Sequence, residues 1–333
     1  MDDIPLSKKQ KILIIRLSSI GDIVLTSPVV RAIKQQLPYA EIHFLLKKQF
    51  QGVMENNPHI SKIHHYLGKK ETLNTLKAEH FDYVVDLQHN LRSKQIVKGL
   101  RVAHSRLHKL NVKKWLLVNL KIHAMPNIHI VDRYFNAVKP LQVVNDNQGL
   151  DFFIPKTEEV DTGDFPAVFE DGFVAVALVG AHQNKRIPLE KVVEICRILY
   201  KPVILLGGND VAEMGDEIEN RLGDRVYNAC GKFSLNESAS ILKHCDCLLT
   251  GDTGMMHIGA ALNVPIASLW GNTVPEFGMY PYMRDRNMFR LFEVHALKCR
   301  PCSKLGYKKC PHKHFKCMNG IEAQEVADWI NSL

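Results

Sequence analysis

The sequence alternates short, wholly apolar runs with stretches of helical periodicity, and it does so in two series. The first series starts with KILIIRL at residues 11–17 and includes the runs 41–46, 63–66 and 83–87. Runs rich in Val, Ile and Leu without polar alternation are typical of strands buried on both faces of a parallel sheet. Helical patterns lie between them, at 22–37 and 70–79 among others. This alternation predicts βαβ units on a parallel sheet.

A second series fills the C-terminal half, after an acidic segment with two prolines at 151–171. Its expected strands are 173–180, 202–208, 225–230, 247–251 and 265–271, and its expected helices are 188–200, 210–222, 234–245 and 254–262. A chain of 333 residues is too long for one ordinary core and suits two domains of about 150 residues each. We therefore expect an N-terminal domain at 1–155, a C-terminal domain at 156–320, and a C-terminal helix at 321–333 that packs back on the N-terminal domain.

Several function classes are disfavoured by what the sequence lacks. Neither half carries G-x-G-x-x-G or a Walker A sequence, which argues against dinucleotide oxidoreductases and P-loop enzymes. No apolar run approaches the ~18–20 residues that span a bilayer. The start MDDIPLSKKQ lacks the order of a signal peptide. We expect a cytoplasmic protein.

Positive charge is concentrated in the N-terminal half. Residues 1–150 hold 23 Lys and Arg against 11 Asp and Glu, although the whole chain is only +8. Nine of these cations fall between Arg92 and Lys121, and the stretch 87–131 has no carboxylate at all. Such a field attracts polyanions or an anionic membrane surface, while a solvated basic face accounts for the same pattern.

Three loops follow expected strands, and ligands of open parallel sheets bind at the carboxyl ends of strands. The first loop, Ser18 to Asp22, offers a carboxylate that could accept a proton from a hydroxyl, or simply an N-cap. The second, from Gly251 to His257, opens a helix whose N–H groups suit a diphosphate, or is a capped helix with a core histidine. The third offers Lys185 and Arg186, which could neutralise a phosphate or remain solvated.

Four cysteines lie in one segment, with the spacing Cys299-x2-Cys302-x7-Cys310-x6-Cys317. This set can hold a tetrahedral structural zinc, with His312 and His314 as possible substitutes. Free thiols and disulfides remain alternatives, the latter disfavoured in a reducing compartment.

Two motifs resemble the lipopolysaccharide heptosyltransferases of glycosyltransferase family 9. KILIIRLSSIGDIVLTSPVVRAIKQQLP resembles that family's first strand, loop and helix, and LLTGDTGMMHIGAALNVPIASLWGNT resembles its donor motif. The resemblance covers most of residues 10–333 and is weak over 90–165. It implies an α/β fold of the GT-B type, with two Rossmann-like domains facing each other across a cleft. The N-terminal domain would receive the acceptor and the C-terminal domain the nucleotide-sugar.

The resemblance also implies roles for individual residues. Asp22 would be the general base, in a loop shared with Ser19 and Gly21, and Lys185 would bind the donor phosphate. Phe233 stands where well-known members have a methionine on the base. The remaining donor-site residues would be Glu213 on the ribose, Ser234 and Leu235 beside the base, and Asp252, Thr253, Gly254 and His257 at the diphosphate and sugar.

The reaction implied is inverting transfer of a heptose from ADP-heptose to a lipopolysaccharide core or a related anionic glycolipid. No cofactor is expected for catalysis, since no D-x-D motif for Mg²⁺ is present. The segment from Lys113 to Leu117 combines cations with Trp115, as a peripheral contact at the cytoplasmic face of the inner membrane would, or forms a buried helix flanked by lysines. Nucleic acid is not an expected partner. The alternatives are a nucleotide-sugar 2-epimerase of similar fold and a non-catalytic binder of anionic glycolipid.

Overall fold

The computed structural model describes residues 10–180 and 185–333, which form two compact units. Unit 1 comprises the chain up to Leu110 together with Ile128–Phe153. Unit 2 comprises Asn111–Asn127 and Ile154–Leu333. Within the described residues, every helix is too short or too polar to cross a lipid bilayer.

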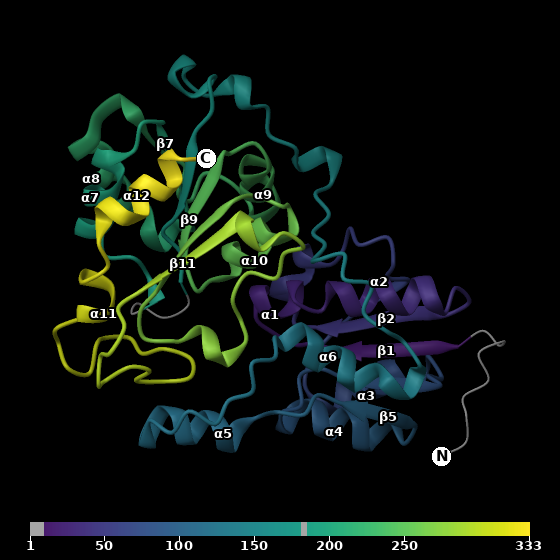
Figure 1. Cartoon of the computed structure of the whole chain (residues 1–333). Coiled ribbons are helices and arrows are strands. Elements are labelled where there is room, and N and C mark those ends of the chain that lie inside the picture. Colours follow the sequence, from purple (N-terminus) through teal and green to yellow (C-terminus); the bar gives the residue numbers. More distant parts are fainter. Residues whose placement is uncertain (1–9, 181–184) are drawn as a thin grey trace. The chain divides into compact units, whose positions relative to one another are not determined.

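Unit 1 is built on a five-stranded sheet in which all neighbouring strands are parallel, with the order β3-β2-β1-β4-β5 (Figure 1). Its strands are β1 (Lys11–Ile15), β2 (Glu41–Leu46), β3 (Lys62–His65), β4 (Tyr83–Asp86) and β5 (Ala103–Arg106). The order reverses between β1 and β4, because β2 and β3 extend the sheet to one side and β4 and β5 to the other. Such a reversal is the place where doubly wound sheets bind ligands.

The helices of unit 1 include one difference from the sequence expectation. The pattern at 22–37 is two helices, α1 (Ile20–Val24) and α2 (Ser27–Gln36), separated at Leu25 and Thr26. Pro28 explains the break, because proline has no N–H and its ring clashes with the carbonyl four residues earlier. The other helical segments of unit 1 are η1 (Lys48–Val53), α3 (Lys69–Lys77), α4 (Leu91–Leu100), α6 (Ile130–Val138) and η3 (Lys139–Leu141).

Unit 2 contains a six-stranded parallel sheet with the order β11-β10-β9-β6-β7-β8. The strands are β6 (Val174–Ala177), β7 (Val203–Leu206), β8 (Val226–Asn228), β9 (Cys247–Gly251), β10 (Ile266–Trp270) and β11 (Phe289–Glu293). The first five were predicted from the apolar runs, whereas β11, the more exposed edge strand, was not. Its order reverses between β6 and β9.

The helices of unit 2 cover this sheet, and the expected periodic segments are all helical (Figure 1). They are α7 (Leu189–Ile198), α8 (Ala212–Leu222), α9 (Leu235–Lys243), α10 (Gly254–Ala261), α11 (Lys316–Asn319) and α12 (Ala323–Asn331). Short 3-10 turns occur at η4 (Lys156–Glu158), η5 (Thr162–Asp164), η6 (Ala167–Phe169), η8 (Asn209–Val211), η9 (Gly223–Arg225), η10 (Pro275–Phe277) and η11 (Arg286–Met288).

The C-terminal helix differs from the expectation that it packs back on the N-terminal domain. Val326, Ala327 and Ile330 of α12 are buried in the core of unit 2, where the helix lies against α7. The reason is its apolar stripe, which completes the hydrophobic layer over β10 and β11.

Part of the basic stretch also lies outside the domain in which it was expected. Asn111–Asn127 includes α5 (Asn111–Trp115) and the π-helical turn η2 (Leu116–Leu120), and it belongs to unit 2. Leu117 is buried against Val274 and Phe277, and Lys114 lies 5.4 Å from the Phe277 ring centroid. One apolar side of the turn therefore attaches it to the loop after β10.

Candidate functional site

The loop after β1 in unit 1 holds Asp22 at the first turn of α1. Ser19 is the N-cap, and its backbone N and its Oγ lie 3.4 and 3.3 Å from Asp22 Oδ2. This is a capping box, so Asp22 contributes to starting the helix in addition to any chemistry. Gly21 is buried inside the same turn.

Arg16, which sequence reasoning did not single out, fixes the carboxylate of Asp22. Its Nη2 lies 2.5 Å from Asp22 Oδ1, its Nη1 donates to Leu87 O at 2.7 Å, and its side chain is only 8% exposed. Burial by itself lowers the pKa of Arg16, but the charge of Asp22, with smaller contributions from Tyr134 and Asp86, outweighs burial and raises it. A buried guanidinium at the end of an apolar strand therefore orients the carboxylate of Asp22.

Asp86 ends β4, the strand beside β1 where the sheet order reverses. Its Oδ1 accepts from the backbone N of Gln88 and of His89, and its Oδ2 accepts from Ser93 Oγ at 2.8 Å. The carboxylate is buried and its acceptors are occupied by the following loop. Asp86 therefore shapes the neighbouring loop rather than offering a second base.

In unit 2 the structure brings two of the predicted residues into direct contact. Lys185 Nζ lies 2.5 Å from Asp252 Oδ2, and both side chains are mostly buried. Thr273, which was not predicted, donates its hydroxyl to the same oxygen at 2.9 Å. These residues follow β6, β9 and β10, so they gather at the reversal of the strand order.

The turn from β9 into α10 has the form expected of an anion site. Thr253 is the N-cap, Gly254 is the first helical residue, and His257 is buried one turn later. A Cβ on Gly251 would lie 2.4 Å from the carbonyl oxygen of Lys185, so only glycine lets the two backbones approach. This close approach places Lys185 beside the N–H groups that begin α10.

The other predicted donor residues follow the next two strands along the same edge. Glu213 is exposed in the first turn of α8, after β7. Phe233 follows β8, with its ring centroid 6.2 Å from that of Phe165. Because the strand order is β10-β9-β6-β7-β8 and all pairs are parallel, the edge carries, in this order, Thr273, Asp252, Lys185, Glu213 and Phe233.

Three predicted positions serve the local structure. Ser234 caps α9 in a capping box with Glu237, and its Oγ also donates to Glu158 Oε2 at 2.6 Å, while Leu235 is the first residue of the helix. Arg186 pairs with Asp210 and donates to Gly180 O, so it turns away from the Lys185–Asp252 pair. Ala181 and Asn184 lie outside the described residues.

The four cysteines of the C-terminal segment form no disulfide. Burial, with smaller contributions from Cys302, Cys310 and Cys299, raises the pKa of Cys317 to about 11. Burial, and then Cys299, likewise raises the pKa of Cys302. The thiols are thus near enough to interact, yet none of the described cysteines is in a group of three ligand atoms within 4.8 Å of one another.

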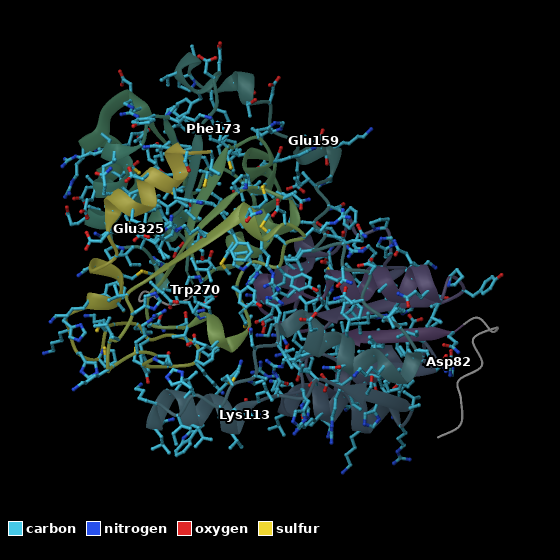
Figure 2. All side chains as sticks on the ribbon, in the orientation of Figure 1. Asp82, Lys113, Glu159, Phe173, Trp270 and Glu325 are labelled. Atoms are coloured by element: carbon cyan, nitrogen blue, oxygen red, sulfur yellow. The ribbon has the colours of Figure 1, made fainter. Side chains whose placement is uncertain are left out.

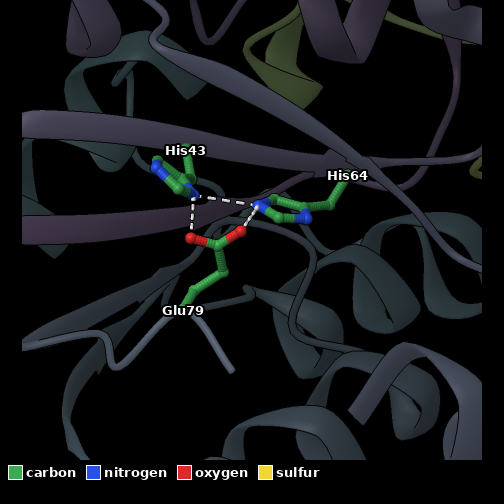
Figure 3. A group of neighbouring side chains, drawn as sticks. All are labelled: His43, His64 and Glu79. Carbon is green, nitrogen blue, oxygen red and sulfur yellow. Dashed lines mark hydrogen bonds and ion pairs between the residues drawn. The ribbon is translucent and has the colours of Figure 1, made fainter. Parts of the chain in front are cut away.

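The described residues do contain one such group, formed by His43, His64 and Glu79 (Figure 3). His43 Nδ1 and His64 Nε2 are 2.9 Å apart, and Lys62 and Lys11 bind the two oxygens of Glu79 at 2.5 and 3.1 Å. Because ammonium groups already hold the carboxylate, we assign the cluster to joining β2, β3 and the end of α3. Burial lowers the pKa of His64 to about 4, and the hydrogen bond from Lys62 lowers that of Glu79 to about 2.

Two doubly wound units, each with polar side chains at its strand reversal, are the components of the GT-B fold. Comparison with known proteins agrees: the model of glycosyltransferase family 9 (heptosyltransferase) matches residues 71–308. The chain belongs to this family, and it is a glycosyltransferase.

Individual relatives are similar along nearly the whole chain. Lipooligosaccharide heptosyltransferase 2 of Haemophilus influenzae is 26% identical over 328 residues, covering 89% of this chain and 92% of the relative. Among solved structures, E. coli ADP-heptose lps heptosyltransferase II has a TM-score of 0.74 at 18% identity, covering 97% of this chain and 98% of that one. E. coli heptosyltransferase WaaC with ADP has a TM-score of 0.68 at 19% identity, covering 97% and 99%. The structural likenesses confirm the predicted fold, and the match to the family model confirms the predicted family.

Proposed function

We propose that this chain transfers a heptose, with inversion, from ADP-heptose to a lipopolysaccharide core or a related anionic glycolipid. The observation that carries the proposal is the order of side chains along the edge of unit 2. Thr273, Asp252 and Lys185 suit the sugar and diphosphate, Glu213 suits the ribose, and Phe233 suits the base, which is the order of groups in a nucleotide-sugar. Solved relatives are described as an ADP-heptose enzyme and as bound to ADP, which supports this donor.

Donor binding would exchange one ion pair for another. Lys185 rests on Asp252, and a diphosphate arriving at the start of α10 offers it a stronger, doubly charged partner. The N–H groups at the start of α10 then donate to the remaining phosphate oxygens. Together they stabilise the leaving diphosphate, so no catalytic metal is required in this scheme.

Transfer itself would be a single displacement. The acceptor hydroxyl gives its proton to Asp22 Oδ2 while its oxygen attacks the anomeric carbon. The bond from that carbon to the diphosphate oxygen breaks, and ADP leaves with the bonding electrons. One attack from the face opposite ADP inverts the configuration. Arg16 keeps the base oriented throughout.

A panel of nucleotide-sugars tests the donor. We expect ADP-heptose to raise the melting temperature more than the corresponding UDP, GDP or CMP sugars, and the product linkage to be inverted when examined by NMR. A larger shift with a UDP-sugar, or retention of configuration, would refute the proposal.

We also propose that unit 2 contacts the cytoplasmic face of the inner membrane through α5. Val112 and Trp115 are 73% and 56% exposed, and Lys113 is exposed beside them on α5 (Figure 2). An exposed aromatic among cations suits the interface of an anionic bilayer. Replacing Lys113 with Gln and Trp115 with Ser should reduce sedimentation with phosphatidylglycerol vesicles, most clearly at low salt. Unchanged, salt-independent sedimentation would refute the contact.

Finally, we propose that Cys299, Cys302, Cys310 and Cys317 bind a structural zinc. The four cysteines lie within one segment and thiolates are usual ligands of structural zinc, although the thiols must approach further to share one ion. Protein purified without chelators should carry about one equivalent of zinc by elemental analysis, and Cys310→Ser should lose it. Metal-free wild-type protein would refute this.

A further inference from the structure

Thr273 reaches the candidate donor site from a short loop that follows β10. Asn272 and Thr273 are each 2% exposed, and the Thr273 hydroxyl donates to Asp252 Oδ2 at 2.9 Å. That oxygen is also the one that receives Lys185. The position of this loop therefore affects how Asp252 is oriented.

Arg300, nearly thirty residues further along the chain, holds the loop in place. Its Nε donates to Gly271 O at 2.6 Å and its Nη2 donates to Thr273 O at 3.0 Å. The guanidinium is 7% exposed and is neutralised by an ion pair with Glu293 at the end of β11. A planar group with five donors can bind two carbonyls and a carboxylate at once, which the single ammonium of lysine cannot reproduce.

The remaining residues around Arg300 fasten the same loop. Cys302 N donates to Asn272 O at 3.3 Å, and Asn272 Nδ2 lies 3.4 Å from Ser303 Oγ. A Cβ on Gly271 would lie 2.8 Å from Met318 Cγ, so this glycine is packed directly under the end of the segment. Gly271, Asn272 and Thr273, which form the loop, are thus all held by contacts with residues 300–318.

We propose that Arg300 is a positioning residue of the donor site, which acts by fixing the loop that presents Thr273 to Asp252. When the diphosphate draws Lys185 away, Thr273 remains as the partner that keeps Asp252 oriented toward the donor. Arg300 itself does not touch the donor. This inference rests on the proposed function, in which Asp252 and Lys185 bind the nucleotide-sugar.

A double-mutant cycle tests the inference by calorimetry with ADP-heptose in the absence of acceptor. Thr273→Val removes the hydroxyl that holds Asp252 once Lys185 turns to the diphosphate, so binding should weaken by up to roughly 10- to 100-fold, the equivalent of a hydrogen bond to a charged group of about 1.5–3 kcal/mol. Arg300→Lys should weaken binding by a similar factor. Because both act through one contact, the double variant should bind about as weakly as the weaker single variant.

Arg290→Lys is the matched control, because Arg290 also pairs with a glutamate of unit 2 but on the exposed side of β11. It should bind ADP-heptose like the wild type. In steady-state assays, Arg300→Lys should raise the KM for the donor and leave the KM for the acceptor unchanged. A purely structural role would instead reduce the active fraction, and hence kcat, with both KM values unaltered.

The outcomes distinguish an error in the role of Arg300 from an error in the location of the donor site. The positioning role would be overturned if the two single-variant losses of ADP-heptose affinity multiply in the double variant. It would also be overturned if Arg300→Lys binds ADP-heptose with wild-type affinity. If Asp252→Ala also binds ADP-heptose normally, the donor site itself is misplaced and both proposals fail. If Asp252→Ala weakens binding while Arg300→Lys does not, only the inference about Arg300 fails.

Discussion

Gly251→Ala tests whether the close approach of β9 to Lys185 builds the donor site. The new Cβ would lie 2.4 Å from the carbonyl oxygen of Lys185, whereas ordinary contacts begin near 3.4 Å. The backbone at Lys185 must therefore move by about 1 Å, the difference between these two distances. The neighbour is a backbone carbonyl in the loop after β6, so it cannot rotate away as a side chain would.

This displacement should affect activity more than folding. A misplacement of about 1 Å in a binding group can lower kcat/KM roughly 100-fold, because the Lys185 ammonium no longer lies at the correct distance from the phosphate. Overpacking in a well-packed region typically costs about 1–3 kcal/mol of stability, which a domain of this size tolerates. The assays are calorimetry with ADP, initial rates with ADP-heptose, and thermal unfolding.

Gly163→Ala is the control, since its Cβ would meet only the Asp161 side chain, at 3.2 Å, in the exposed turn η5. It should behave as the wild type in all three assays. Wild-type ADP affinity and turnover in Gly251→Ala would refute the reasoning, because they would show that the site does not depend on where Lys185 lies. Unfolding of the variant before any assay would be checked by circular dichroism, and Gly251→Ser offers a second, polar test of the same contact.

Three further predictions follow from the geometry. Asp22→Asn keeps the shape of the capping box but removes the base, so turnover should fall by about 10²–10⁴-fold while calorimetry finds ADP affinity unchanged; turnover near the wild-type value would contradict the mechanism. Lys185→Ala leaves Asp252 facing the diphosphate without its cation, so ADP should bind more weakly, by roughly 10-fold or more, in the same assay. The pKa of His64 is lowered to about 4 when folded against about 6.5 unfolded, so the unfolded state binds more protons across this window and stability is lost as pH falls through it. Denaturant titrations should find the wild type about 2 kcal/mol less stable at pH 5 than at pH 7 from this group, and His64→Gln should flatten that slope.

Local sequence patterns were sufficient for most strands and helices and for the loops that carry the site. Apolar runs predicted β1 and β9, and Thr253 followed by a helical pattern predicted the start of α10, because strand burial and helix capping depend on neighbours in sequence. Parallel pairing then required Asp22 and Asp252 to stand at carboxyl ends of strands. The family resemblance added the residue roles, which the fold alone does not specify.

Contacts between distant segments could not be predicted in this way. Arg16 was one cation among many until the fold buried it against Asp22 and Leu87. Thr273 had no distinguishing local pattern. Its role depends on its contacts with Asp252, which follows the adjacent strand, and with Arg300, which follows β11.

The same limit explains the two segments that were assigned to the wrong domain. The apolar stripe on α12 and the side chain of Leu117 after α5 must each be buried against other apolar residues. The periodicity of the sequence shows that such a partner is needed, but it does not show which domain supplies it. The sequence by itself determined most of the strands and helices, and which loops can bind an anion or hold a base. Only the tertiary structure decided which surfaces are buried together and which cations face which carboxylates, because those energies depend on residues tens to hundreds of positions apart along the chain.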